Sequence, residues 1–208
     1  MNPASRMLRK WRYGDEIIVV SGLPRSGTSM LMKMLAAGGV PVLTDELRTS
    51  DVDNPGGYFE HERIKDLESE QDKSWLRQAR GKALKVISHL LKALPDNNYY
   101  RVILIRRDLE EIIQSQNIML ENRNEPNPVA DRKAMEFYGN HLVDTKVYAR
   151  RRPNFDMLEV HYRLTLADPL SVSREIDTFL GGGLDVQAMA AVVNHDLYRN
   201  RNTGAGQA

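Results

Sequence analysis

The sequence predicts an α/β fold of three layers, in which a parallel sheet is flanked by helices on both faces. Short aliphatic runs alternate with helix-favouring stretches along the chain, which is the order typical of such sheets. The 208 residues are 41% hydrophobic and 27% charged, proportions typical of a folded domain that buries its own core. We therefore expect a single domain over residues 1–208, with ligands bound at the carboxyl ends of the strands.

The first predicted unit is a strand, a glycine-rich loop and a helix. Residues 16–21 contain four consecutive aliphatic residues, which indicate a buried strand. The loop that follows holds Gly22 and Gly27, and the helix-favouring stretch that starts at Thr28 ends at a pair of glycines. This order places the loop at the carboxyl end of a strand.

The middle of the chain is predicted to add further elements around a long loop. Residues 44–60 are rich in Asp, Asn, Pro and Gly, and they read as an ordered loop that leads into a helix near His61. A loop of more than about 12 residues in a compact domain is often functional, although a plain surface excursion has the same composition. The other elements expected here are a short strand at 40–43, a strand at 83–87, a short helix at 88–94, a strand at 100–105, and a helix capped by Asp108 that runs to about residue 122.

The last part of the chain continues the alternation. We expect a helix at 131–151, a strand at 155–161, a helix at 169–180 and a final helix from Asp185. The basic segment 1–13 and the tail 202–208 are expected to be flexible. As an alternative, Met7, Leu8 and Trp11 lie among the bases of the first segment in the pattern of a short surface-binding helix.

Composition excludes several classes of function. The net charge of +1 gives no overall field for nucleic acid, and the absence of Cys removes disulfides and thiolate nucleophiles. No apolar run approaches the ~20 residues of a membrane span, and no signal-peptide core follows the first bases. We therefore expect a cytoplasmic protein without a membrane span, a nucleic-acid partner or a metal site.

The glycine-rich loop reads Gly22-Leu-Pro-Arg-Ser-Gly27-Thr28-Ser29 and has the glycine spacing of a P-loop. Backbone N–H groups and the following helix N-terminus favour a phosphate at such a turn. The predicted phosphate ligands are Pro24, Arg25, Ser26, Gly27, Thr28 and Ser29. However, Thr28 stands where a loop that binds a nucleoside triphosphate needs Lys, and the strand at 100–105 ends in arginines instead of a metal-binding carboxylate. Both differences argue against ATP.

A second anion site is indicated by Arg107 and Ser115. Arg107 follows the end of a predicted strand, and Ser115 lies eight residues later, about two turns along the next helix. A shared phosphate is one interpretation. The other is a surface ion pair of Arg107 with Glu111 or Asp108.

Both elements resemble those that bind 3'-phosphoadenosine-5'-phosphosulfate (PAPS) in the sulfotransferase superfamily. PRSGTSMLMKML is similar to the 5'-phosphosulfate loop, with the Pro-Arg-Ser-Gly-Thr of tyrosylprotein sulfotransferases, and RRDLEEIIQS is similar to the 3'-phosphate element. The likeness extends to the Lys85 strand, to YRLTLADP at 162–169 and to Phe179-Leu-Gly, and the chain looks like short bacterial sulfotransferase-domain proteins. It departs from the family in having no evident catalytic His at the usual spacing.

The resemblance implies transfer of a sulfuryl group from PAPS, as co-substrate, to an acceptor hydroxyl or amine, with release of PAP and no metal requirement. It implies that Arg25 and Lys85, or alternatively Lys82, neutralise charge on the transferring group. The general base stays open among Glu60, Glu46 and His61. The expected acceptor is a small molecule, a lipid or a saccharide. The alternatives are a P-loop small-molecule kinase and a non-catalytic protein that binds PAPS or PAP.

Overall fold

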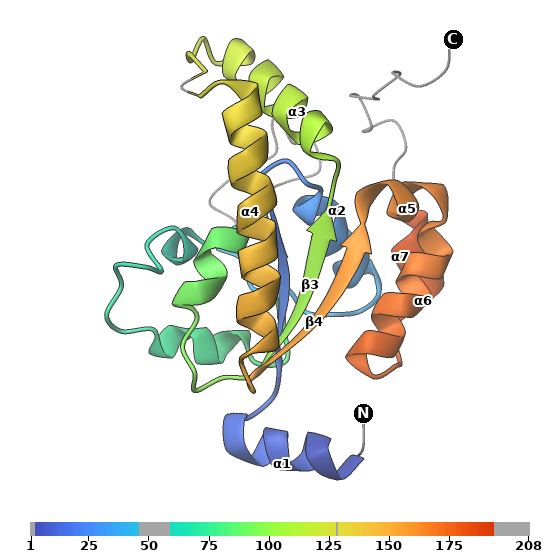
Figure 1. Cartoon of the computed structure of the whole chain (residues 1–208). Coiled ribbons are helices and arrows are strands. Elements are labelled where there is room, and N and C mark those ends of the chain that lie inside the picture. Colours follow the sequence, from blue (N-terminus) through green and yellow to red (C-terminus); the bar gives the residue numbers. More distant parts are fainter. Residues whose placement is uncertain (1–2, 46–58, 128, 194–208) are drawn as a thin grey trace.

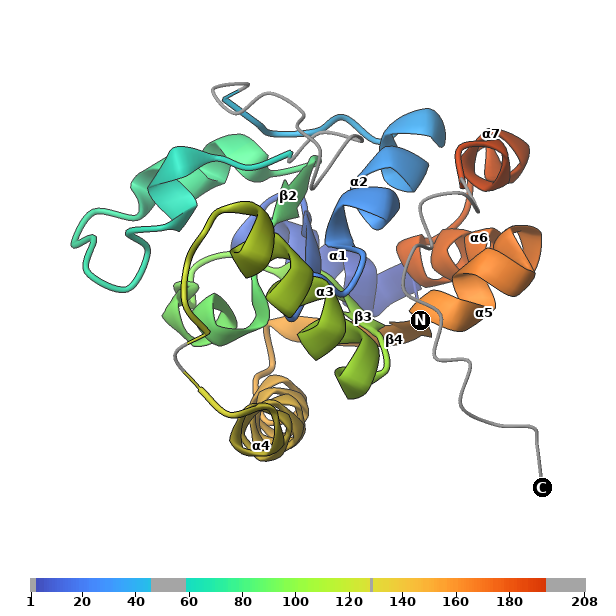
Figure 2. The ribbon, with the colours of Figure 1, turned by 90° about the horizontal axis from the view of Figure 1, so that it is seen from above.

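The computed structural model describes residues 3–45, 59–127 and 129–193. Its centre is a sheet of parallel strands in the order β2-β1-β3-β4. The strands are β1 (Ile17–Gly22), β2 (Ala83–Lys85), β3 (Tyr100–Arg106) and β4 (Phe155–His161). Helices cover both faces of the sheet (Figures 1 and 2), which confirms the predicted three-layer α/β fold.

The strand register aligns the carboxyl ends of all the strands at one edge of the sheet. Val20 pairs with Lys85, Gly22 pairs with Ile105, and Arg106 pairs with His161. The ends of β1, β2 and β3 therefore bring the glycine loop, Lys85, Arg106 and Arg107 to the same edge.

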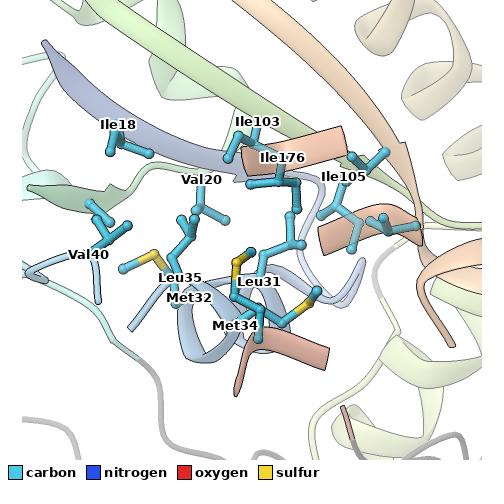
Figure 3. Packing of buried hydrophobic residues seen from close by; sticks show 14 of the residues in the cluster. Ile18, Val20, Leu31, Met32, Met34, Leu35, Val40, Ile103, Ile105 and Ile176 are labelled. Atoms are coloured by element: carbon cyan, nitrogen blue, oxygen red, sulfur yellow. The ribbon is translucent and has the colours of Figure 1, made fainter. Parts of the chain in front are cut away.

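One face of the sheet is covered by α2 (Thr28–Ala37), α5 (Tyr162–Ala167), α6 (Pro169–Leu180) and α7 (Val186–Ala191). Ile18 and Val20 of β1 point to this face and pack with Leu31, Leu35 and Ile176 (Figure 3). These side chains are almost completely buried. The packing of α2 against the sheet fixes the position of the helix that begins at the glycine loop.

The other face is covered by α4 (Asp131–Arg150) and by three short 3₁₀ helices, η1 (Glu62–Ile64), η2 (Ser74–Ala79) and η3 (Ser88–Ala93). Ile17 and Val19 point to this side, because successive strand residues face opposite ways. Beyond the carboxyl edge, α3 (Leu109–Asn122) packs with α4 through Ile112 and Leu142, which enclose Leu23 of the glycine loop.

Several local predictions were wrong in detail. The expected strand at 40–43 is a single bridge between Val42 and Ala83, and the strand expected to reach Ile87 ends at Lys85. The helices expected near His61 and at 88–94 are of the tighter 3₁₀ type. Short helices α5 and η2 form in stretches where no helix was expected, because their support comes from packing across the domain.

The basic N-terminal segment, for which we expected a flexible chain or, as the alternative, a short helix, forms helix α1 (Pro3–Tyr13). Arg9 forms hydrogen bonds with Tyr99 and Asp156, which lie near the amino ends of β3 and β4. These contacts join residues distant in the sequence, so local composition does not reveal them. The tail at 202–208 lies outside the described residues. Within the described ranges, we find no helix long and apolar enough to cross a membrane.

Candidate functional site

The glycine loop joins β1 to α2, and two of its glycines are required by close contacts. A Cβ atom on Gly22 would lie 2.4 Å from Ser26 Oγ and 2.9 Å from the carbonyl oxygen of Ile105. Gly27 has a φ of 106°, and a Cβ there would lie 2.6 Å from the ring of Tyr162. The P-loop spacing in the sequence therefore reflects a turn packed tightly against β3 and α5.

The start of α2 is suited to an anion. Gly27 is its N-cap and has no side chain, so the N-cap residue offers no side-chain acceptor to the first N–H groups of the helix. Ser26 is 1% exposed, and its hydroxyl has no hydrogen-bond partner in the described part of the chain. Buried polar groups normally have a partner. The helix N-terminus and this hydroxyl together fit a phosphate group.

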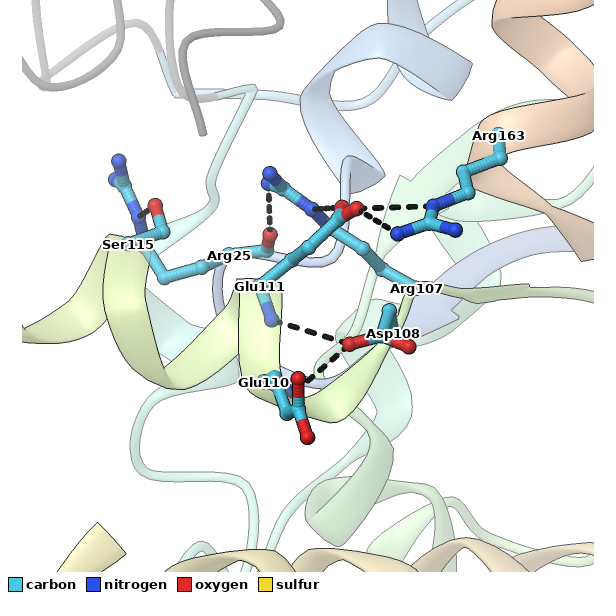
Figure 4. A network of polar contacts seen from close by, with 7 residues as sticks. All are labelled: Arg25, Arg107, Asp108, Glu110, Glu111, Ser115 and Arg163. Atoms are coloured by element: carbon cyan, nitrogen blue, oxygen red, sulfur yellow. Dashed lines mark hydrogen bonds and ion pairs between the residues drawn. The ribbon is translucent and has the colours of Figure 1, made fainter. Parts of the chain in front are cut away.

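Arg25 connects the loop to the second predicted anion element (Figure 4). Its Nε atom donates a hydrogen bond to Ser115 Oγ at 3.1 Å, and its carbonyl oxygen accepts one from Arg107 Nη1 at 3.1 Å. Arg25 has a φ of 68°, an uncommon conformation for a residue with a side chain. The structure therefore places Arg25 of the glycine loop next to Arg107 and Ser115, the two residues that the sequence assigned to a second anion site.

A buried carboxylate holds two arginines beside this site. Glu111 is completely buried; its Oε2 accepts from Arg107 Nε at 2.9 Å, and its Oε1 accepts from Nε and Nη2 of Arg163 at 2.9 and 2.6 Å. Arg107 also lies over the ring of Tyr162, with 4.6 Å to the ring centroid. The ion pair of Arg107 with Glu111, which was the alternative interpretation, is present, but it is buried instead of lying on the surface. Asp108 instead caps α3 by accepting from the N–H groups of Glu110 and Glu111.

Arg163 was missed by the sequence analysis. It lies on α5, which was not predicted, and its partner Glu111 was considered as a partner of Arg107 but not of Arg163. The one available signal was the position of Arg163 directly after a strand and Tyr162, at the edge where ligands bind.

Lys85 lies on the opposite side of the loop and contacts two predicted site residues. It is the last residue of β2, its side chain is only 7% exposed, and its Nζ lies 3.1 Å from Glu60 Oε1 and 3.4 Å from Ser29 Oγ. The alternative, Lys82, precedes the amino end of the same strand, where its carbonyl accepts from Ile18. Lys85 is therefore the lysine that lies beside the loop.

The candidates for a general base differ in the residues that they contact. Glu60 contacts Lys85, whereas the ring of His61 stacks on Trp75 at 4.7 Å between centroids, and its Nδ1 lies 3.9 Å from Asp45 Oδ2. Glu46 lies outside the described residues. Among the residues that are described, no group of three or more His, Asp or Glu side chains is arranged to hold a metal ion.

Comparisons with solved structures identify proteins that have a similar fold. Sulfotransferase STF1 from Mycobacterium tuberculosis has a TM-score of 0.57 at 18% identity, over 90% of this chain and 76% of that one. The sulfotransferase domain of the Synechococcus olefin synthase has a TM-score of 0.55 at 18% identity, over 88% and 78%. Mouse sulfotransferase SULT7A1, solved as a complex with PAP, has a TM-score of 0.52 at 18% identity, over 86% and 62%.

The chain therefore has the fold of sulfotransferases. It spans 62% of the length of the mouse protein. No protein-family model matches the chain, and no curated protein matches it in sequence. At these identities the likeness establishes architecture, so the activity has to be argued from the site.

Proposed function

We propose that this protein is a sulfotransferase that moves the sulfuryl group of PAPS to an acceptor hydroxyl or amine and releases PAP. One observation carries the proposal: Arg25 of the glycine loop contacts both Arg107 and Ser115, so two anion-binding elements are side by side. A ligand with phosphates at two separate positions suits such a pair, and the sulfotransferase fold supports the same choice.

The residues present fit the two charged ends of PAPS. The start of α2 and the buried hydroxyl of Ser26 suit the 5'-phosphate, since both offer hydrogen-bond donors to an anion. Arg107 and Ser115 suit the 3'-phosphate. Thr28 replaces the Lys on which nucleoside triphosphate loops rely, and β3 ends in arginine, which makes ATP with Mg²⁺ the poorer fit.

Charge and position supply the catalysis in this proposal. In transfer, the bond from sulfur to the 5'-phosphate oxygen breaks while a bond from sulfur to the acceptor oxygen forms. Arg25 and Lys85 stabilise the charge that builds up on the oxygens during this exchange. The Nζ atom of Lys85 also lies 3.1 Å from Oε1 of Glu60 and so holds this carboxylate in place. Glu60 receives the proton that the acceptor loses.

The acceptor is proposed to be a small molecule, a lipid or a saccharide, and the protein is proposed to act in the cytoplasm without a metal. The proposal constrains the donor more closely than the acceptor, because the elements proposed to bind PAPS lie within the described residues. A panel of acceptors is therefore part of the functional test.

The test is transfer of radiolabel from labelled PAPS to a panel comprising a nitrophenol, alkyl alcohols, an amino sugar and a tyrosine peptide. We expect label on at least one acceptor and a loss of turnover in Lys85→Ala of about 10²–10³-fold, typical of removing a donor that stabilises transition-state charge. Lys82→Ala is the matched control and should retain activity.

Two outcomes would replace the proposal. Binding of PAP without transfer to any acceptor would indicate a non-catalytic PAPS-binding protein. Transfer of phosphate from ATP with Mg²⁺, in the absence of sulfuryl transfer, would indicate a kinase.

A further inference from the structure

Helix α1 exposes an apolar face that the proposed function does not use. Trp11 is 85% exposed, Met7 is 78% exposed and Leu8 is 65% exposed, and Trp11 and Met7 are the two most exposed large apolar side chains among the described residues. Single exposed apolar residues are ordinary, but a cluster of three with a Trp indicates an interaction surface. We call Met7, Leu8 and Trp11 the α1 face.

The opposite side of the helix holds α1 against the domain. Arg9 pairs with Asp156 at 2.9 Å and lies over the ring of Tyr99, while Tyr13 is 7% exposed and packs against the same ring. At about 100° per residue, the mean direction of the α1 face lies roughly 170° from that of Arg9 and Tyr13. The helix is therefore anchored by one side and presents the other outward.

Basic side chains border the α1 face on both sides. Lys10 and Arg12 are exposed and lie roughly 100° to either side of its centre. The helix contains no acid, and the nearest acid in sequence is Asp15, which pairs with Lys10 at 2.7 Å. An apolar stripe with Trp between two cationic edges is the pattern of a helix that lies in the interface of an anionic membrane.

We propose that α1 docks this protein on the surface of an anionic lipid bilayer, with Met7, Leu8 and Trp11 in the interface and Lys10 and Arg12 at the headgroups. A second copy of the chain suits the face less well. In a twofold dimer, the same patch meets itself, so the cationic edges of the two copies would be brought together. Lipid phosphates complement these edges.

The orientation of the docked protein follows from the fold. Tyr99 and Asp156, which hold α1, lie near the amino ends of β3 and β4, whereas the glycine loop lies at the carboxyl ends of the strands. Figure 1 shows α1 below the sheet and α3 above it. Docking through α1 therefore leaves the glycine loop facing away from the bilayer, accessible to molecules in solution.

Sedimentation of the full chain with vesicles tests the proposal without any PAPS chemistry. We expect binding to vesicles of phosphatidylcholine with phosphatidylserine, and far weaker binding to phosphatidylcholine alone. Trp11→Ala should weaken binding at least about tenfold, because it removes a large apolar side chain from the interface. Lys10→Gln with Arg12→Gln should weaken it by a similar factor, since each base contributes near the surface. Phe137→Ala is the control, because Phe137 is a 67% exposed aromatic residue on α4.

Fluorescence gives a second measurement of the same event. The chain has two Trp residues, and Trp75 is 6% exposed, so a change on adding vesicles reports Trp11. We expect a blue shift with anionic vesicles that is absent in Trp11→Phe. An absence of vesicle binding would overturn the proposal, as would equal loss in Phe137→Ala. A dimer that Trp11→Ala dissociates, or a large fall in the melting temperature of Trp11→Ala, would also overturn it, because the α1 face would then be covered by protein.

Discussion

Replacing Glu111 with Gln tests how the two arginines beside the phosphate loop are held. Glu111 is completely buried and accepts hydrogen bonds from Arg107 and Arg163, and the Arg107 side chain is only 8% exposed. Gln preserves the shape of the side chain but removes the negative charge, so the charge of Arg107 loses its partner in a buried position. Breaking a buried ion pair from one side typically costs 3–5 kcal/mol.

The exposure of the second arginine reduces this cost. Arg163 is 53% exposed, so water screens its part of the interaction. We expect a loss of about 3 kcal/mol in the free energy of unfolding, and a fall in melting temperature of about 6–12 °C for a domain of this size. Urea denaturation and thermal melting measure the two quantities.

Glu110 provides the matched control, because it is an exposed carboxylate in the same helical turn. Glu110→Gln should change the free energy of unfolding by less than about 0.5 kcal/mol. If Glu111→Gln is no less stable than Glu110→Gln, the buried charge network does not hold Arg107, and the reasoning on its position fails.

Three further predictions concern chemistry and pH. Glu60→Gln should lower kcat by about 10²–10⁴ with an alkyl alcohol and leave PAP affinity nearly unchanged. The loss of kcat should be smaller with a nitrophenol, because a nitrophenol is already partly ionised when it binds. If kcat is unchanged in both Glu60→Gln and Glu46→Gln, neither residue is the base. Turnover should persist in excess EDTA, and rescue of a chelated enzyme by Mg²⁺ would favour a kinase-like mechanism. Burial, together with the charges of His89 and Lys92, lowers the pKa of His141 in the folded protein. The unfolded chain then binds the proton more readily, so the free energy of unfolding should fall as the pH drops below about 6.5. Between pH 7.5 and 5.5, the melting temperature should fall less steeply in His141→Gln than in the unmodified chain.

The sequence predicted best the elements whose limits are set locally. The strand and the helix expected at 155–161 and 169–180 form at the same limits as β4 and α6. Asp168 caps α6 by accepting from the N–H of Ser171, and Gly181 closes it in a left-handed conformation. Such signals lie within a few residues of the element they limit, so a single sequence reveals them.

Contacts between distant residues limited the rest. Two contacts depend on how strands and helices assemble. They are the ion pair of Lys85 with Glu60 and the hydrogen bonds of Glu111 with Arg107 and Arg163. Helix α1 was considered only as an alternative to a flexible segment, because the contact of Arg9 with Asp156, 147 residues away, cannot be inferred from the local sequence. The candidate binding residues could thus be selected from their type and spacing in the sequence, whereas their contacts with other residues became visible only in the fold. The binding and catalytic roles of all the site residues stay predictions, including those of Pro24, Ser26, Thr28, Ser29 and Glu46.

The central claim is that Arg107 and Ser115 bind the 3'-phosphate of PAPS while the glycine loop binds the 5' end. Calorimetric titration with PAP and with adenosine-5'-phosphosulfate, which lacks the 3'-phosphate, tests it most directly. Arg107→Ala should weaken PAP binding by about 1.5–3 kcal/mol, the range for charge-assisted hydrogen bonds, and Ser115→Ala by about 0.5–1.5 kcal/mol. Binding of adenosine-5'-phosphosulfate should hardly change in either variant. Equal losses for both ligands, or no measurable binding of PAP by the unmodified chain, would contradict the account.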